Sequence, residues 1–125
     1  MFALFLILTV RTNAQISFMY SDKNMNTYTI KETELKYEPI QKEESSSGLY
    51  SGGETKIKII TPYELNKISV LFEEALSDTL SHLKGRQMGS GLFIRYTKTK
   101  VDKKIIMKFD SENQKKVEAL LKGLL

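Results

Sequence analysis

The chain of 125 residues has no cysteine, one histidine and two prolines. Without cysteine it cannot form disulfides, use a thiol in catalysis or build a zinc site on thiolates. A metal site at His82 would need carboxylates as all its other ligands, because no second histidine exists. We therefore expect no metal and no cofactor.

Long apolar runs are also missing. Residues 1–10 carry no charge and are followed by Arg11. Ten residues are too few to cross a hydrocarbon core about 30 Å thick, but they suit the apolar part of a secretory signal. Thr12 and Ala14 provide small side chains before a cleavage site near Ala14 and Gln15. The pattern predicts a signal peptide over residues 1–15 and one exported domain, periplasmic or extracellular, over residues 16–125; the alternative is a buried first strand or helix.

The charge surplus is small. From position 16 onward the chain has 18 basic and 15 acidic residues. Nucleic-acid-binding modules usually concentrate basic residues on one stripe with aromatic residues between them, and this sequence has no such stripe. We expect a protein or small-molecule partner, no nucleic acid and no stable membrane span.

Hydrophobic periodicity predicts an α+β domain in the order βββαββα. Alternating patterns indicate strands near residues 27–31, 35–40, 56–60, 92–98 and 104–109, with a further edge strand at 16–20. The apolar phase changes between the stretches at residues 27–31 and 35–40, so a turn or bulge is expected at residues 32–34. The expected architecture is one antiparallel sheet of four or five strands, with a long helix packed on one face and a short C-terminal helix.

The boundary between the strand at residues 56–60 and the long helix has the clearest local signal. Thr61 is suited to the N-cap, Pro62 to the first helical position and Glu64 to the third, which together make a capping box. Apolar residues then recur at helical spacing as far as Leu83. We expect His82 in the last helical turn as a surface capping residue, not as a catalytic base.

A stretch rich in serine and glycine precedes that boundary. Residues 45–53 read Ser-Ser-Ser-Gly-Leu-Tyr-Ser-Gly-Gly, and residues 86–91 form a second loop with glycine. Such loops can hold a ligand through backbone amides and hydroxyls, with Tyr50 as a stacking surface; the alternative is a plain connection with Leu49 and Tyr50 in the core. The candidate ligand-binding residues are Ser45, Ser46, Ser47, Gly48, Tyr50, Ser51, Gly52, Gly53 and Arg86.

The same stretch carries a resemblance. A Tyr-x-Pro strand, two acidic residues, the segment Ser-Ser-Ser-Gly-x-Tyr-Ser-Gly-Gly, a strand and a helix with Leu-Phe-Glu follow one another. From about Tyr37 to the C-terminus, this succession resembles an uncharacterised family of small exported bacterial proteins. The resemblance implies export and a similar fold, and it implies no activity.

A second site is suggested by the strands. If Ile57 and Ile59 face the core, the outward faces of the strands carry a basic patch that suits an anionic glycan or a membrane surface. The alternative is a solvated face whose lysines protect against edge pairing. The residues of this patch are Lys56, Lys58, Arg95 and Lys108.

No catalytic arrangement stands out. The serines at 45–47 have no evident base, and Glu73 and Glu74 are neighbours on a helix, so they point about 100° apart. We therefore expect a non-catalytic exported protein that binds a partner or small ligand through its Gly/Ser loops. Binding of anionic surfaces is the alternative, and a serine-dependent hydrolase is a remote one.

Overall fold

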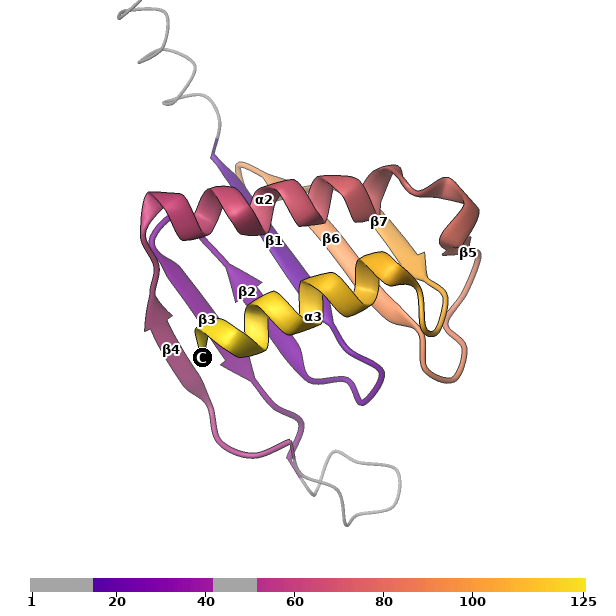
Figure 1. Cartoon of the computed structure of the whole chain (residues 1–125), viewed down its shortest axis with the longest axis horizontal. Coiled ribbons are helices and arrows are strands. Elements are labelled where there is room, and N and C mark those ends of the chain that lie inside the picture. The colour runs from indigo at the N-terminus through magenta and orange to yellow at the C-terminus, as the bar shows by residue number, and fades with distance from the viewer. Residues whose placement is uncertain (1–14, 42–51) are drawn as a thin grey trace, which may run out of the picture.

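A computed structural model describes residues 15–41 and 52–125, which form one antiparallel sheet with two helices on the same face (Figure 1). The sheet order is β4-β3-β2-β1-β6-β7-β5. The strands are β1 (Ile16–Ser21), β2 (Thr27–Ile30), β3 (Glu34–Glu38), β4 (Lys56–Ile59), β5 (His82–Leu83), β6 (Gly91–Thr97) and β7 (Lys100–Met107). The helices are α2 (Pro62–Ser77), the 3-10 turn η2 (Thr79–Ser81) and α3 (Glu112–Leu124).

The α+β class and the single antiparallel sheet are confirmed, but the expected number of strands is wrong. The described residues form seven strands, four before α2 and three after it. The leader predicted over residues 1–15 and the exported destination stay predictions, because residues 1–14 lie outside the described part. None of the helices in that part is long and apolar enough to cross a membrane.

The sequence suggested that the first strand lies at an edge of the sheet. Strand β1 instead lies in its centre. It pairs with β2 through a short turn and with β6 from late in the chain. Phe18 and Tyr20 face the helices and are buried, whereas Met19 faces the other side opposite Thr29 and Ile94. The pairing with β6 depends on a distant segment, and for this reason local sequence does not reveal it.

We call the side of the sheet under the helices the covered face and the other side the open face. The covered face holds aromatic rings in contact: the ring centroids of Phe18 and Phe72 are 4.7 Å apart, those of Tyr20 and Phe93 4.8 Å, and those of Phe72 and Phe93 5.4 Å. In the described residues no helix lies over the open face (Figure 1). The core is therefore one layer between the sheet and the two helices.

Strand β4 has the opposite orientation from the one expected. Ile57 and Ile59 are 59% and 71% exposed on the open face, and Lys56 and Lys58 lie on the covered side opposite Tyr37 and Leu35. The cause is Ile60, which is only 4% exposed. Because side chains alternate along a strand, burying Ile60 under α2 places Lys58 and Lys56 on the same side as Ile60 and both other isoleucines outside.

Helix α2 begins as expected and ends early. The Thr61 hydroxyl accepts a hydrogen bond from the Glu64 backbone N–H at 3.1 Å, and the Glu64 carboxylate accepts one from the Thr61 backbone N–H at 2.9 Å, which completes the capping box. The helix ends at Ser77 with Asp78 as its C-cap; η2 follows, and His82 and Leu83 then pair with β7. His82 thus lies in β5, and its Nε2 is 3.0 Å from the Ala75 carbonyl oxygen in the last turn of α2.

Two hairpin turns are short. The turn between β2 and β3 contains Glu32 and Thr33, and Lys31 N–H donates to the Glu34 carbonyl at 2.8 Å, so the expected turn at residues 32–34 is confirmed. The turn between β6 and β7 uses Lys98 and Thr99 at φ 50° and 71°, a pair of positive φ values typical of a type I′ hairpin.

Candidate functional site

Three connections gather at one end of the sheet, which we call the loop end (Figure 1). They are the β1–β2 turn at residues 22–26, the segment at residues 52–55 that leads into β4, and the β5–β6 connection at residues 84–90. Two of these carry residues proposed from the sequence, Gly52, Gly53 and Arg86. The remaining candidates lie outside the described residues and stay predictions: Ser45, Ser46, Ser47, Gly48, Tyr50 and Ser51.

The β1–β2 turn is held by a buried carboxylate. Asp22 Oδ1 accepts hydrogen bonds from the backbone N–H groups of Asn24 and Asn26, both at 2.9 Å, and Asp22 Oδ2 accepts one from Asn26 Nδ2 at 3.1 Å. Asp22 and Asn26 are 6% and 3% exposed. An Asp side chain that bonds the following backbone fixes a turn without regular secondary structure, so this turn is a rigid support.

Gly52 packs against one side of that turn. Its N–H donates to the Ile40 carbonyl at 3.0 Å, and its carbonyl accepts a hydrogen bond from the Tyr37 hydroxyl at 2.8 Å. A Cβ at this position would lie 2.1 Å from Asn26 Oδ1, so no residue larger than glycine fits without movement. Gly53 follows at φ 104°, a region that glycine favours.

Arg86 holds the other side of the turn. Its Nη2 donates to the Asp22 carbonyl at 3.2 Å and lies 3.1 Å from Met25 Sδ, and its Nη1 donates to the Ser90 carbonyl at 3.1 Å. These partners carry no charge. Within the described ranges no carboxylate forms an ion pair with Arg86, so the loop end has a fixed, exposed positive charge.

The structure therefore brings the two glycine-bearing segments to the same turn. Gly52 contacts it at Asn26 and Arg86 at Asp22 and Met25. A guanidinium whose orientation is fixed by carbonyl oxygens can hold an anionic or strongly polar group. Asp22 and Asn26 were missed as support residues; the turn-forming residues at 21–26 gave a signal for a turn, but not for its place between the two loops.

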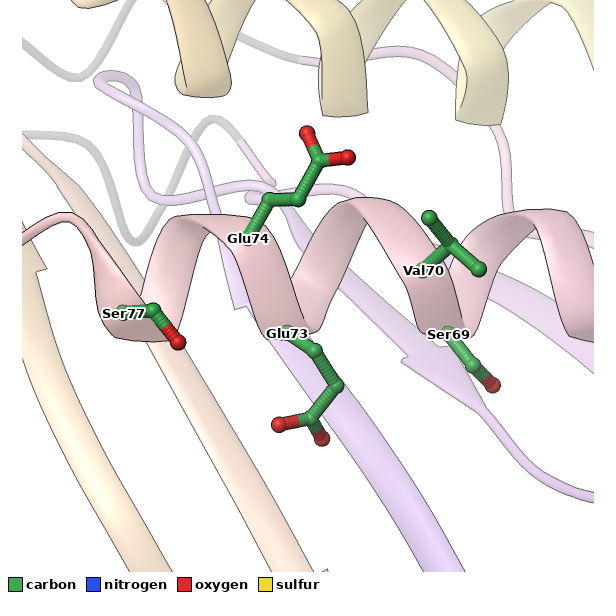
Figure 2. Close-up of a pocket in the computed structure, with 5 residues that line it drawn as sticks. All are labelled: Ser69, Val70, Glu73, Glu74 and Ser77. Atoms are coloured by element: carbon green, nitrogen blue, oxygen red, sulfur yellow. The ribbon is translucent and has the colours of Figure 1, made fainter.

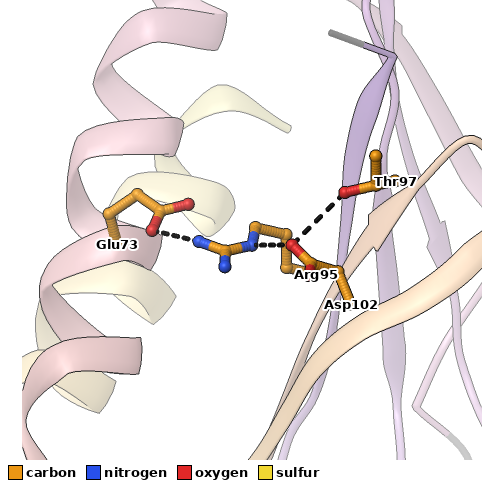
Figure 3. Close-up of polar contacts among 4 residues, drawn as sticks. All are labelled: Glu73, Arg95, Thr97 and Asp102. Carbon is orange, nitrogen blue, oxygen red and sulfur yellow. Dashed lines mark hydrogen bonds and ion pairs between the residues drawn. The ribbon is translucent and has the colours of Figure 1, made fainter.

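The four residues of the proposed basic patch do not share a surface. Arg95 lies on the covered side, where its Nη1 contacts Glu73 of α2 and its Nε lies 2.7 Å from Asp102 Oδ2 (Figure 3). These bonds, first the one to Glu73, raise the pKa of Arg95 and neutralise its charge. Lys56 and Lys58 lie four strands away on β4, and Lys108 follows β7 with its N–H bonded to the Ser81 carbonyl. The expected outward basic face is therefore wrong.

A shallow hollow lies along one side of α2. It has a volume of about 470 Å³ and is lined by Ser69, Val70, Glu73, Glu74 and Ser77 (Figure 2). Glu73 and Glu74 point to different sides of the helix, as expected, and Glu73 is bonded to Arg95. Since one helix supplies every lining residue, the hollow is a shallow surface feature. It offers no opposed acid and base.

A smaller hollow of about 250 Å³ lies on the open face. It is lined by Ser17, Met19, Thr29, Lys31, Tyr96 and Thr99. Neither hollow contains a metal-ligating cluster, because the described residues include no group of three or more His, Cys, Asp or Glu side chains that could hold an ion. The hydrolase alternative stays a prediction, since its serines lie outside the described ranges.

Comparisons with protein families, with curated proteins and with solved structures find no match to this chain. The resemblance to small exported bacterial proteins thus stays a prediction.

Proposed function

We propose that the chain is a non-catalytic binding domain and that its ligand site is the loop end of the sheet. Arg86 holds an anionic part of a partner or small ligand there, beside the turn at residues 22–26. The observation that carries the proposal is the shared support: Arg86 bonds to the same turn, residues 22–26, against which Gly52 packs.

The chemistry favours an anion over a neutral ligand. The Arg86 guanidinium is exposed, is held at two of its nitrogens by carbonyl oxygens, and has no ion pair among the described residues. A guanidinium held in one orientation recognises planar or tetrahedral oxyanions by charge-assisted hydrogen bonds. Because the carbonyl contacts fix the side chain in advance, binding would cost little side-chain entropy.

The test is an NMR titration of the ¹⁵N-labelled chain with inorganic phosphate, succinate and glucose. Phosphate or succinate should shift the amide signals of Gly52, Gly53 and Gln87 in a saturable way, and glucose should not. Arg86→Gln should weaken binding about tenfold or more, since a hydrogen bond to a charged group contributes roughly 1.5–3 kcal/mol.

Lys84→Gln is the matched control. Lys84 is exposed, lies two positions before Arg86 in the same connection, and loses the same charge in this variant. It should leave the affinity within about twofold, as expected for a surface charge outside the contact. Equal losses in the two variants, or signal shifts spread over all lysine-rich surfaces, would reject the site.

A further inference from the structure

We propose that the free edge of β4 binds an extended peptide segment in which acidic and apolar side chains alternate, so that the segment adds a strand to the sheet. This surface is separate from the contacts of Arg86, and the proposal does not depend on the loop-end site.

The backbone of β4 has N–H and C=O groups that point away from the sheet and can pair with another strand. Among the described strands its one neighbour is β3. The Ile60 N–H donates to the Thr33 carbonyl at 3.0 Å, which continues the register in which Glu34 lies opposite Ile59. Since inward and outward bonding alternate along an antiparallel strand, Lys56 and Lys58 bond toward β3, and the N–H and C=O groups of Ile57 and Ile59 point away from the sheet.

The side chains of the edge also alternate, by chemistry and by face. Ile57 and Ile59 lie on the open face and are more than half exposed, while Lys56 and Lys58 lie on the covered side. Directly opposed side chains on paired strands are close enough to contact. A fitting strand therefore places apolar side chains beside the isoleucines and carboxylates beside the lysines.

Charge selects this partner over a second copy of the chain. In an antiparallel β4–β4 pair held by the outward groups of Ile57 and Ile59, even-numbered residues lie opposite even-numbered residues. The two-fold axis then places Lys58 opposite Lys56 or opposite its own counterpart. Like charges directly opposed across strands are destabilising, so self-pairing is disfavoured and an acidic strand is favoured.

The other edge of the sheet lacks these features. Strand β5 covers only Ile106 and Met107 of β7 and leaves the first part of β7 without an outer neighbour among the described residues. That part contains a register irregularity in which Asp102 has no opposite residue, and Lys103 and Lys104 point to opposite faces. Bulges and lysines on both faces are features that prevent edge pairing.

The first experiment measures fluorescence anisotropy of a labelled peptide, Gly-Glu-Val-Glu-Val-Glu-Gly, with the full chain. Saturable binding is expected, at least tenfold tighter than that of the peptide with lysine in place of glutamate. The double variant Lys56→Glu with Lys58→Glu should reverse this preference. Lys103→Glu with Lys104→Glu makes the same charge change on the other edge and should leave the preference unchanged.

The second experiment separates strand addition from simple charge attraction. Ile57→Pro removes an outward N–H while the bonds from Lys56 and Lys58 to β3 remain, and proline is tolerated where the N–H of an edge strand faces solvent. This variant should lose binding at least tenfold, and Ile57→Thr, which keeps the N–H, should lose only a few-fold. Circular dichroism confirms that both variants are folded.

Four binding results would each overturn the proposal. They are no saturable binding of the acidic peptide, equal binding of both peptides, reversal of the preference by the control pair on β7, and full binding by a folded Ile57→Pro variant. A dimer in sedimentation that Ile57→Pro dissociates would also overturn it, because the edge would then belong to a second copy.

Discussion

The covered and open faces of the sheet are built from the same strands but differ in composition. On the covered face, aromatic rings from β1 and β6 contact Phe72 of α2, and Tyr20, Phe72 and Phe93 have no exposed surface. The open face holds serine, threonine, lysine and scattered apolar residues, such as Thr29, Lys36 and Ile57. Alternation along a strand thus separates two environments only one residue apart.

The difference shows which residues hold the fold and which remain available for other roles. Burial of large side chains is the main source of stability, so the covered face carries most of the folding free energy. The open face and the β4 edge can change at small cost to the fold. The predictions below test this division, beginning with the largest effect.

The largest difference is expected between adjacent residues on β6. Phe93→Ala removes a buried ring and should lower the free energy of unfolding by about 3–5 kcal/mol. Leu92→Ala, on the open face of the same strand and half-buried, should cost roughly 1 kcal/mol. Urea unfolding followed by circular dichroism measures both. Similar losses would contradict the division between the two faces.

A smaller difference is expected at high pH. The hydroxyl of the buried Tyr20 donates to Oε2 of the half-buried Glu118 at 2.5 Å. Burial, followed by the bond to Glu118, raises the pKa of Tyr20 well above its usual range. The folded state therefore favours neutral Tyr20. This contribution is complete below the unfolded pKa of about 10 and declines as pH rises above it, by at most roughly 1.4 kcal/mol per pH unit.

Tyr20→Phe should remove that part of the pH dependence, which urea unfolding between about pH 9 and 11 would measure. Tyr96→Phe on the open face is the control, because it removes the same hydroxyl from a half-buried position. If both substitutions change the slope of stability against pH equally, the covered face has no special part in it.

The smallest effect is expected on the exposed isoleucines of β4. Ile57→Thr with Ile59→Thr should change the free energy of unfolding by less than about 0.5 kcal/mol, since both side chains are largely exposed and threonine suits a strand. The measurement is thermal unfolding of the double variant beside the wild type. A loss above roughly 2 kcal/mol would mean that the open face of β4 is packed against something in the folded chain.

Local signals predicted local structure well. The capping box at Thr61 and the turn at residues 32–34 are confirmed, because each depends on residues within four positions of one another. Alternation also identified which residues of β4 share a face. It did not tell which face is buried, because an edge strand with two lysines and two isoleucines fits either orientation, and the burial of Ile60 decides between them.

Long-range pairing was beyond the local signals. The apolar spacing predicted a helix as far as Leu83, but residues 82–83 pair with β7 in the sheet, and Leu80 is 92% exposed. At the loop end the sequence identified Arg86 and Gly52 as candidates. It could not show that both contact the β1–β2 turn, because that turn reaches them only when β1 lies between β2 and β6.

The central place of β1 also has a consequence for synthesis. Strands β1 to β4 are joined in order and can pair as each leaves the ribosome, but β1 gains its second neighbour only when β6 has been made. Contacts between distant segments slow folding, and an open strand edge invites wrong pairing meanwhile. Among the described strands, the one that is made first is thus among the last to gain both of its neighbours.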